Sequence, residues 1–302
     1  MHEARWIQRY IAPLVSAPGA AALKDDVALL TSTAEDTIVT TDMLVEGRHF
    51  FSSDPLSTVG QKLLRVSVSD IYAKGALPGE ALLSIAWPTE RSEAEFAALM
   101  DGIGADLLRF GVKLIGGDLV STSGDLVLNL VLTGVIKRGA LPRRTGARPG
   151  YSIWISGDIG HGGLGLAAAL EGGDPEALAR YQVPELPSLK QVETVSNHAS
   201  AAMDVSDGLL IDAARMAEAS GVAVELQIEA VPLAAPARSA EDALEQCAAG
   251  DDYQILVATP PDVELVGFFK IGTVIEGQGL RLSWHGEAIA LPEKLGYLHG
   301  ES

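Results

Sequence analysis

Cysteine is nearly absent from this chain, and its scarcity excludes two kinds of protein. The single cysteine, Cys247, among 302 residues can form neither an intramolecular disulfide framework nor a cysteine-rich zinc site. Basic residues are also few, because 22 Lys and Arg stand against 40 Asp and Glu, which gives a formal net charge of -18. A surface with this charge repels nucleic acid and anionic membranes. The composition favours a globular protein of the reducing cytoplasm without nucleic-acid or membrane partners.

Long hydrophobic runs are missing as well, although 47% of the residues are hydrophobic. No apolar run reaches the roughly 20 residues that a membrane-spanning helix needs. The segment from Ile11 to Leu23 is apolar, but Pro13 and Pro18 interrupt it and Glu3 precedes it, which does not fit a signal peptide. We expect instead a short N-terminal helix with Trp6, Ile7, Tyr10, Ile11 and Leu14 on one face.

The common nucleotide-binding motifs are absent or incomplete. The sequence contains no P-loop motif and no protein-kinase catalytic motif. Residues 160–165 match Gly-x-Gly-x-x-Gly, but a dinucleotide fold also needs a strand that ends in an acidic residue about twenty positions later. Glu185 has that spacing and lies between Pro184 and Pro187, where no strand is expected. A Rossmann domain is therefore disfavoured.

The first half of the chain alternates strand-like and helix-like segments, which predicts an α/β fold with mixed strand pairing. A capping box at Ser92 and Glu95 marks one helix start. The expected strands are Thr37–Thr41, Ala81–Trp87, Val112–Ile115 and Asp125–Ile136, and the expected helices are Ser57–Gly75 and Ser92–Phe110.

The second half repeats the alternation after an irregular, arginine-rich stretch at 137–150, so we expect two domains, at 1–138 and 139–302. The expected strands are Tyr151–Ser156, Ala201–Val205, Val222–Ile228, Tyr253–Ala258, Ile271–Ile275 and Leu282–Trp284. The expected helices are Gly163–Leu170, Leu189–His198, Gly208–Ser220 and Asp242–Ala248.

Acidic residues recur beside the predicted elements, and their spacing suggests one shared site. Asp42 follows the β-branched run that begins at Val39, which predicts a carboxylate just past a strand end. Two carboxylates about 4 Å apart repel by roughly 4 kcal/mol at a protein surface, so several can converge only around cations. Aspartates without neighbouring His or Cys ligands favour Mg²⁺ completed by substrate phosphates. The other acidic clusters are Asp25-Asp26, Ser69-Asp70, Gly117-Asp118 and Asp204-Val205-Ser206-Asp207.

The order of these motifs resembles the thiamine-monophosphate kinase family, which belongs to the PurM-like superfamily of aminoimidazole-ribotide synthetase. The resemblance extends over nearly the whole chain. Besides the acidic clusters it rests on Thr40-Thr41-Asp42 with Glu46-Gly47 and His49-Phe50, on Gly116-Gly117-Asp118, and on Gly250-Asp251-Asp252-Tyr253. It implies a PurM-like two-domain α/β (α+β) fold: an N-terminal ATP- and Mg²⁺-binding domain whose mixed sheet pairs in a homodimer, and a C-terminal α/β domain.

The activity that the resemblance implies is a thiamine-phosphate kinase, in which ATP phosphorylates thiamine monophosphate directly and in line on a cluster of Mg²⁺ ions. Asp42, Asp70 and Asp118 would be the central residues of catalysis. The implied metal ligands are Asp26, Thr41, Asp42, Asp70, Asp118, Asp204 and Asp207. The implied ATP contacts are Gly117, Asp118, Arg144 and Ser206, and the implied contacts to thiamine monophosphate are His49, Asp251 and Tyr297.

Structural roles are the alternative for each of these residues taken singly. Asp26 fits a turn, Asp207 fits a cap of the following helix, and Arg144 fits a solvated linker. His161 and Cys247 are expected to be structural. Asp251 stands where the family usually has Glu, and this difference bears on the choice of substrate.

Two other functions stay open at this point. One is a sister enzyme of the superfamily that resembles selenophosphate synthetase or the hydrogenase-maturation dehydratase, although both ends of this chain lack the reactive cysteine of those enzymes. The other is a nucleotide-binding protein without catalysis. The retained aspartates favour the kinase over both.

Overall fold

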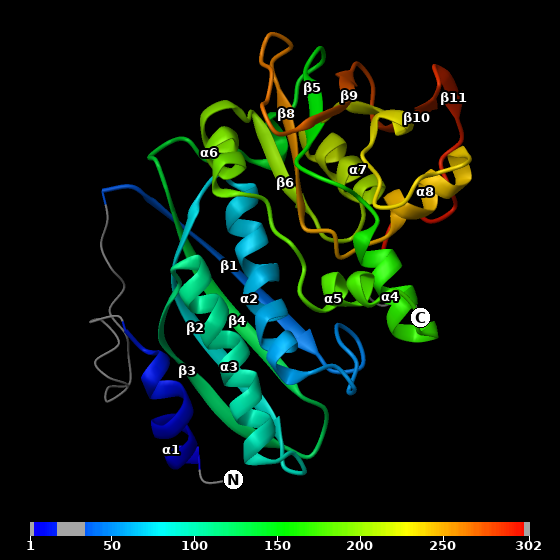
Figure 1. Cartoon of the computed structure of the whole chain (residues 1–302). Coiled ribbons are helices and arrows are strands. Elements are labelled where there is room, and N and C mark those ends of the chain that lie inside the picture. The colour runs from blue at the N-terminus through cyan, green and yellow to red at the C-terminus, as the bar shows by residue number, and fades with distance from the viewer. Residues whose placement is uncertain (1–2, 17–33, 299–302) are drawn as a thin grey trace. The chain divides into compact units, whose positions relative to one another are not determined.

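The computed structural model describes residues 3–16 and 34–298, and the chain divides into two compact units. Unit 1 consists of Met1–Ile71 and Leu77–Arg138, and unit 2 consists of Tyr72–Ala76 and Gly139–Ser302 (Figure 1). The predicted metal ligand Asp26 lies outside the described residues. Among the described residues, no helix has both the length and the hydropathy needed to cross a membrane.

Unit 1 is built on a four-stranded sheet with the strand order β1-β4-β2-β3. Strands β1 and β2 run antiparallel to β4, whereas β3 runs parallel to β2, so the pairing is mixed. Residues of β4 alternate between buried and partly exposed along its whole length, as a strand with one covered face does. The strands are β1 (Asp36–Val45), β2 (Leu77–Pro88), β3 (Lys113–Thr122) and β4 (Val127–Ile136).

Helices α2 (Leu56–Ala73) and α3 (Glu93–Phe110) cover one face of this sheet (Figure 1). Two glycines let them approach closely: a Cβ on Gly60 would lie 2.6 Å from the Leu99 carbonyl oxygen, and one on Gly102 would lie 1.9 Å from that of Ser57. The capping box predicted for α3 is present, with Ser92 as the N-cap residue. The opposite face of the sheet has no covering helix among the described residues of unit 1.

A short N-terminal helical segment packs on unit 1, in agreement with the sequence prediction. It comprises α1 (Glu3–Trp6), a π-helix (Ile7–Ile11) and a 3-10 turn (Ala12–Leu14). The Trp6 ring is buried, and its centroid lies 4.7 Å from that of Phe96 and 6.1 Å from that of Trp87. These aromatic contacts fix the segment to the core of unit 1.

Unit 2 contains a seven-stranded sheet with the order β11-β10-β7-β9-β5-β8-β6. Only the β10–β7 pairing is parallel. The strands are β5 (Ser152–Ile155), β6 (Ala201–Val205), β7 (Ala223–Gln227), β8 (Gln254–Thr259), β9 (Phe269–Ile275), β10 (Gly279–Trp284) and β11 (Glu287–Ile289).

Helix α7 packs on this sheet and contributes to the hydrophobic core of unit 2. Buried residues of α7, among them Leu209, Leu210 and Met216, belong to the same core cluster as Ile155 and Leu256 of the sheet. Gly221, in the left-handed conformation, ends α7 as its position predicts. The helices are α4 (His161–Glu171), α5 (Pro175–Gln182), α6 (Leu189–His198), α7 (Leu209–Ser220) and α8 (Ala240–Ala248). Short 3-10 turns lie at Arg144–Gly146 and Ile228–Ala230.

Several strands are longer than the sequence indicated, and in β1 and β3 this corrects the placement of a site residue. Strand β1 continues to Val45, so Asp42 lies inside the strand, and β3 continues to Thr122, so Asp118 also lies inside a strand. The physical reason is pairing. Ten consecutive residues of β1 pair with β4, and Asp118 pairs with Ser84 of β2.

Candidate functional site

Asp42 and Asp70 come together on the covered face of the unit 1 sheet. In β1, residues 40, 42 and 44 are less exposed than their neighbours, so Thr40 and Asp42 point toward α2. Asp70 lies near the end of α2, and its carboxylate accepts a short hydrogen bond from the Thr40 hydroxyl. The strand and the helix thus bring side chains thirty residues apart in the sequence to one position.

Burial and like charge both act on the Asp42 carboxyl. Burial is the largest cause that raises the pKa of Asp42, and the neighbouring Asp70 charge raises it further. The nearby Ser67 hydroxyl lowers it, and the resulting pKa is about 6. Asp42 Oδ2 and Ser67 Oγ are both buried, and neither makes a hydrogen bond of normal geometry with a described residue. A buried carboxylate oxygen without a donor, next to a second carboxylate, is an environment that a cation would stabilise.

Asp118 and Thr41 do not join this pair within unit 1. Asp118 pairs with Ser84 and, by strand alternation, shares the uncovered face of the sheet with Val120. Thr41 is exposed on that same face, where Asn129 Nδ2 donates to its hydroxyl over 2.9 Å. Strands β1 and β3 are three strand spacings apart, roughly 14 Å at about 4.8 Å per spacing. One sheet therefore holds these two groups of residues on opposite faces.

Gly117 precedes Asp118 at a point where no other residue fits. A Cβ atom on Gly117 would lie 1.8 Å from the carbonyl oxygen of Leu83 on the neighbouring strand. The sequence left open whether Gly117 serves a tight turn or the approach of a phosphate. The structure shows a third reason, which is the close approach of β3 to β2.

His49 lies in a tight loop after β1, and the loop fixes its ring. The Val45 N–H donates to His49 Nδ1 over 3.0 Å, so the ring proton is on Nε2. The side chain of the buried Lys62 donates to the His49 carbonyl oxygen over 3.2 Å. Glu46 of the same motif is structural, because it pairs with Arg91 at 2.7 Å and accepts the Leu126 N–H.

In unit 2, backbone hydrogen bonds bring together three segments that the sequence separates. The Asp251 N–H donates to the Ser206 carbonyl oxygen, and the Tyr297 N–H donates to that of Asp207, both over 2.8 Å. A Cβ atom on Gly250 would lie 2.7 Å from the Ser206 carbonyl oxygen. Four predicted site residues thus share one region of unit 2: Ser206, Asp207, Asp251 and Tyr297.

Asp251 has an unusual backbone conformation and a fixed side chain. It and Tyr253 are two of the three described non-glycine residues with positive φ, at 66° and 52°. Such conformations cost energy in non-glycine residues and often occur at functional sites. The buried Tyr253 hydroxyl donates to Asp251 Oδ1 over 2.8 Å. Tyr253 was not singled out from the sequence, and the positive-φ pair that involves it has no sequence signal of its own.

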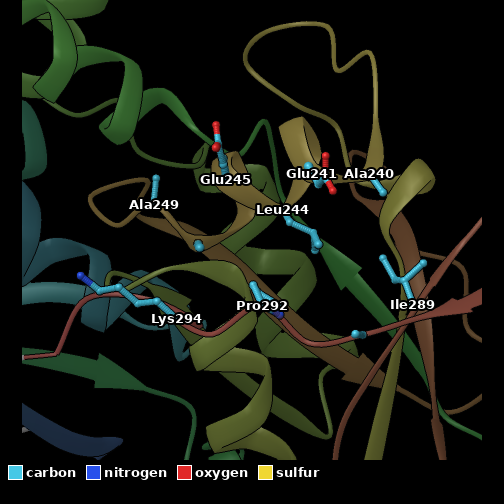
Figure 2. A pocket seen from close by; sticks show the side chains of 10 residues that line it. Ala240, Glu241, Leu244, Glu245, Ala249, Ile289, Pro292 and Lys294 are labelled. Atoms are coloured by element: carbon cyan, nitrogen blue, oxygen red, sulfur yellow. The ribbon is translucent and has the colours of Figure 1, made fainter.

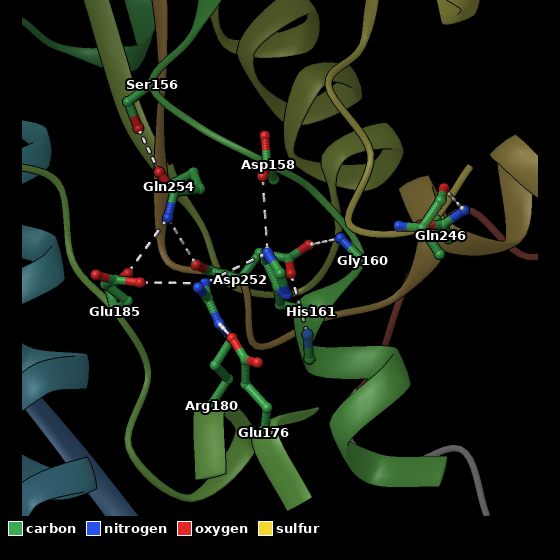
Figure 3. Close-up of polar contacts among 12 residues, drawn as sticks. Ser156, Asp158, Gly160, His161, Glu176, Arg180, Glu185, Gln246, Asp252 and Gln254 are labelled. Carbon is green, nitrogen blue, oxygen red and sulfur yellow. Dashed lines mark hydrogen bonds and ion pairs between the residues drawn. The ribbon is translucent and has the colours of Figure 1, made fainter. Parts of the chain in front are cut away.

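A carboxylate of the protein itself, that of Asp252, binds the glycine-rich segment at 160–165. Figure 3 shows the buried Asp252 carboxylate against this segment, where it accepts the Gly160 N–H over 2.9 Å and the Gly162 N–H over 3.1 Å. Burial raises the pKa of Asp252 to about 7, and these N–H groups oppose the rise. Because a protein carboxylate binds the N-terminus of α4, this glycine motif has a structural role and does not bind a dinucleotide phosphate. His161 lies beside it, with Arg180 Nη1 3.4 Å from its Nε2.

The remaining predicted residues of unit 2 lie in three settings. Asp204 is buried in β6, whereas the Arg144 side chain is exposed on a 3-10 turn. Asp207 forms an ion pair with Arg215, with 2.6 Å between the two atoms. Arg215 was not singled out from the sequence, although its spacing of eight residues from Asp207 on a helix start offered a signal.

A cavity of about 690 Å³ opens beside α8 in unit 2. Figure 2 shows its lining side chains, with Leu244, Ile289 and Pro292 as apolar walls. None of the predicted site residues lines it. Its shape therefore does not define the predicted site.

No closed metal centre is preformed in the described part of the chain. There, no group of three or more His, Cys, Asp or Glu side chains stands close enough to hold a metal ion. Within the described part of unit 1, the convergence of carboxylates that the sequence predicts is therefore limited to the pair Asp42 and Asp70.

Comparison with known proteins identifies relatives over the whole chain. Residues 24–136 match the N-terminal domain of the AIR synthase related proteins, and residues 148–285 match their C-terminal domain. A thiamine-monophosphate kinase of Caulobacter vibrioides is 36% identical over 97% of this chain and 90% of its own length. The thiamine-monophosphate kinase of Aquifex aeolicus is 32% identical over 85% of this chain and 87% of its own length.

Solved structures show the same fold. The structure of AaThiL complexed with AMPPCP and TMP has a TM-score of 0.76 at 28% identity and covers 92% of this chain and 94% of its own. Escherichia coli HypE has a TM-score of 0.78 at 18% identity over 96% of this chain and 97% of its own, a likeness of fold alone. The motif order, the two-unit α/β architecture and these relatives show that the chain belongs to the thiamine-monophosphate kinase family of AIR synthase related proteins, within the PurM-like superfamily.

Proposed function

We propose that this protein transfers the γ-phosphoryl group of ATP to thiamine monophosphate, giving ADP and thiamine diphosphate by direct in-line displacement. The Asp42–Asp70 pair carries the proposal, because a buried carboxylate oxygen that stands beside a second carboxylate is an environment that a cation would stabilise. The relatives named for this reaction, and the AaThiL structure with AMPPCP and TMP, support the choice of substrates.

Mg²⁺ fits the donors that unit 1 offers, since Asp42 and Asp70 are hard oxygen ligands without a His or Cys beside them. When bound, Mg²⁺ would neutralise phosphate charge and so lower the electrostatic barrier between two anionic substrates. Asp42 and Asp70 would hold it, with Asp204 of unit 2 and Asp26 as further proposed ligands. Thr40, whose hydroxyl already contacts Asp70, keeps that carboxylate oriented.

The protein's own groups would align the two substrates, and no covalent enzyme intermediate is needed. We assign ATP contacts to Gly117, Asp118, Arg144 and Ser206, where the exposed Arg144 offers a fork of N–H donors to phosphate oxygens. An oxygen of the thiamine monophosphate phosphate would attack the γ-phosphorus as the bond to the ADP oxygen breaks. Alignment of this kind supplies much of the rate enhancement in phosphoryl transfer.

The acceptor substrate would contact His49, Asp251 and Tyr297. His49 offers the Nε2–H to the phosphate group, and Asp251 offers a carboxylate to the cationic thiamine. Tyr297, 41% exposed, presents a ring face on which an aromatic cation can stack. The Tyr253 hydroxyl donates to Asp251 Oδ1 and would keep this carboxylate oriented for the contact.

We also propose that the two units act as the N-terminal ATP- and Mg²⁺-binding domain (1–138) and the C-terminal domain (139–302), and that two copies pair through their unit 1 sheets. The uncovered face of that sheet exposes apolar side chains, Val39 at 68% and Met43 at 53% among them. Large exposed apolar patches mark interaction surfaces. Since Asp118 and Thr41 lie on this face, a second copy could complete the surroundings of both.

The experiment is an assay of ADP formation at millimolar Mg²⁺ with thiamine monophosphate, free thiamine, aminoimidazole ribotide precursors or selenide as acceptor. Turnover with thiamine monophosphate, and its loss in Asp42→Asn and Asp70→Asn, is the expected result. Turnover only with another acceptor would indicate a sister enzyme of the superfamily. Nucleotide binding without turnover on any acceptor would indicate a binding protein.

A further inference from the structure

Arg215 contacts Asp207, which the sequence resemblance implies as a ligand of a divalent ion. One guanidinium nitrogen, Nη1, donates to Asp207 Oδ2 over 2.6 Å and to Asp212 Oδ1 over 2.8 Å. Asp212 is almost completely buried, at 1% side-chain exposure, and Asp207 at 17% is largely buried. A single positive charge therefore bridges two carboxylates at the start of α7.

The same bridge fixes the backbone of the loop ahead of α7. Asp212 Oδ2 accepts the N–H groups of Ser206 and Asp207, each over 3.2 Å. Through Asp212, Arg215 is connected to the loop that carries Ser206, the proposed ATP contact. The interaction is of the charge-assisted kind, which is about twice as strong as a hydrogen bond between neutral groups.

A divalent ion on Asp207 conflicts with this arrangement. Mg²⁺ binds carboxylate oxygens at about 2.0–2.1 Å, so an ion on Asp207 Oδ2, the oxygen that Arg215 already contacts, would stand within about 5 Å of Nη1. Like charges at that distance repel strongly where side chains are largely buried, and the guanidinium keeps its proton at any physiological pH. Burial lowers the pKa of Arg215, but the interactions with Asp207 and Asp212 together outweigh it and raise the pKa above its usual value.

We propose that Arg215 is a built-in cation that replaces a divalent ion at Asp207, so that Asp207 is a positioning residue and not a metal ligand in this chain. This inference rests on the proposed function only for the role of the loop. It removes Asp207 from the ligand set that the family resemblance implies and leaves the other proposed ligands unchanged. The loop with Ser206 is then ordered before metal or nucleotide binds.

The test counts bound Mn²⁺ in the purified full-length protein by equilibrium dialysis, with and without AMPPCP, for wild type, Asp207→Asn and Arg215→Gln. The expected result is an equal number of ions per chain in wild type and Asp207→Asn. Arg215→Gln, which frees the Asp207 carboxylate, should bind one additional ion. Loss of one ion in Asp207→Asn would overturn the proposal.

A metal-free measurement gives a second readout. In EDTA, Arg215→Gln should lower the melting temperature by about 2–6 °C, and Mn²⁺ should restore part of the loss. Arg281→Gln, which removes the same charge from an exposed position of unit 2, is the matched control and should change neither quantity. An Arg215→Gln variant as stable as wild type in EDTA would contradict the proposal. Equal ion counts in wild type and Asp207→Asn support the proposal about Arg215 whether or not AMPPCP binds. Failure of AMPPCP to bind wild type would instead count against the proposed kinase function.

Discussion

Replacing Asp42 by Asn should stabilise the metal-free protein while it abolishes turnover. Burial of the carboxyl, together with the neighbouring Asp70 charge, raises the pKa of Asp42 from 3.8 to about 6 in the folded state. The folded protein therefore holds this proton more tightly than the unfolded chain does. The stabilisation is fully present below pH 3.8 and is lost as the pH rises through about 6.

The size of the effect follows from the shift. Two pKa units correspond to about 3 kcal/mol, an upper limit because the side chain keeps some solvent contact and Asn must also be desolvated. At pH 7.5 Asp42 is ionised and bears this cost, whereas Asn does not. We expect Asp42→Asn to raise the melting temperature in EDTA by up to roughly 5–10 °C at pH 7.5 and to change it little at pH 4.

The assay is thermal or urea unfolding in EDTA at several pH values, followed by addition of Mg²⁺ and AMPPCP. Wild type should gain stability with these ligands, and Asp42→Asn should gain much less. Asp118→Asn is a control for the metal-free arm, because Asp118 is exposed and its replacement should leave metal-free stability unchanged. If Asp42→Asn is less stable than wild type at pH 7.5, or keeps the wild-type pH dependence, the reasoning about this carboxyl is wrong.

Three further changes test other parts of the structure. The double change Val39→Glu and Met43→Glu places charge on the uncovered sheet face and should convert a dimer to a monomer in light scattering. The control Val266→Glu in unit 2 should leave the dimer intact. A monomeric wild type would refute the pairing. Gly117→Ala puts a Cβ atom 1.8 Å from the Leu83 carbonyl oxygen and should cost at least about 2 kcal/mol in urea unfolding, with Gly124→Ala as a neutral control. Tyr253→Phe removes the hydrogen bond to Asp251 and should raise KM for thiamine monophosphate about tenfold with a smaller change in kcat; an unchanged KM would exclude that role.

The sequence predicted helices better than strand lengths. The capping box at Ser92 and the terminal Gly221 are local signals, and the structure confirms both helix boundaries. Strand β1 was predicted to end before Asp42, because an acidic residue disfavours a strand locally. Its ten-residue pairing with β4 overrides that preference, and pairing partners cannot be read from one segment of sequence. Helix α5 was missed because it is short and lies in a segment with prolines on both sides.

For the candidate site, the sequence motifs named individual residues, but the contacts between residues far apart in the sequence could not be predicted. The resemblance named Ser206 and Asp251 as site residues, and a backbone hydrogen bond joins them in the structure. The resemblance did not predict that Asp42 and Asp118 lie on opposite faces of one sheet, because a face depends on strand register. It also did not reveal Tyr253 and Arg215, whose roles come from hydrogen bonds to a neighbouring carboxylate.

The loop that follows β1 limits the chemistry open to His49. Because the Val45 N–H already fills the lone pair of Nδ1, the imidazole cannot pick up a second proton without breaking that contact. A ring locked in one tautomer is unsuited to shuttling protons, and it presents a permanent N–H dipole at Nε2. In the proposed contact with thiamine monophosphate, this N–H would donate to a phosphate oxygen.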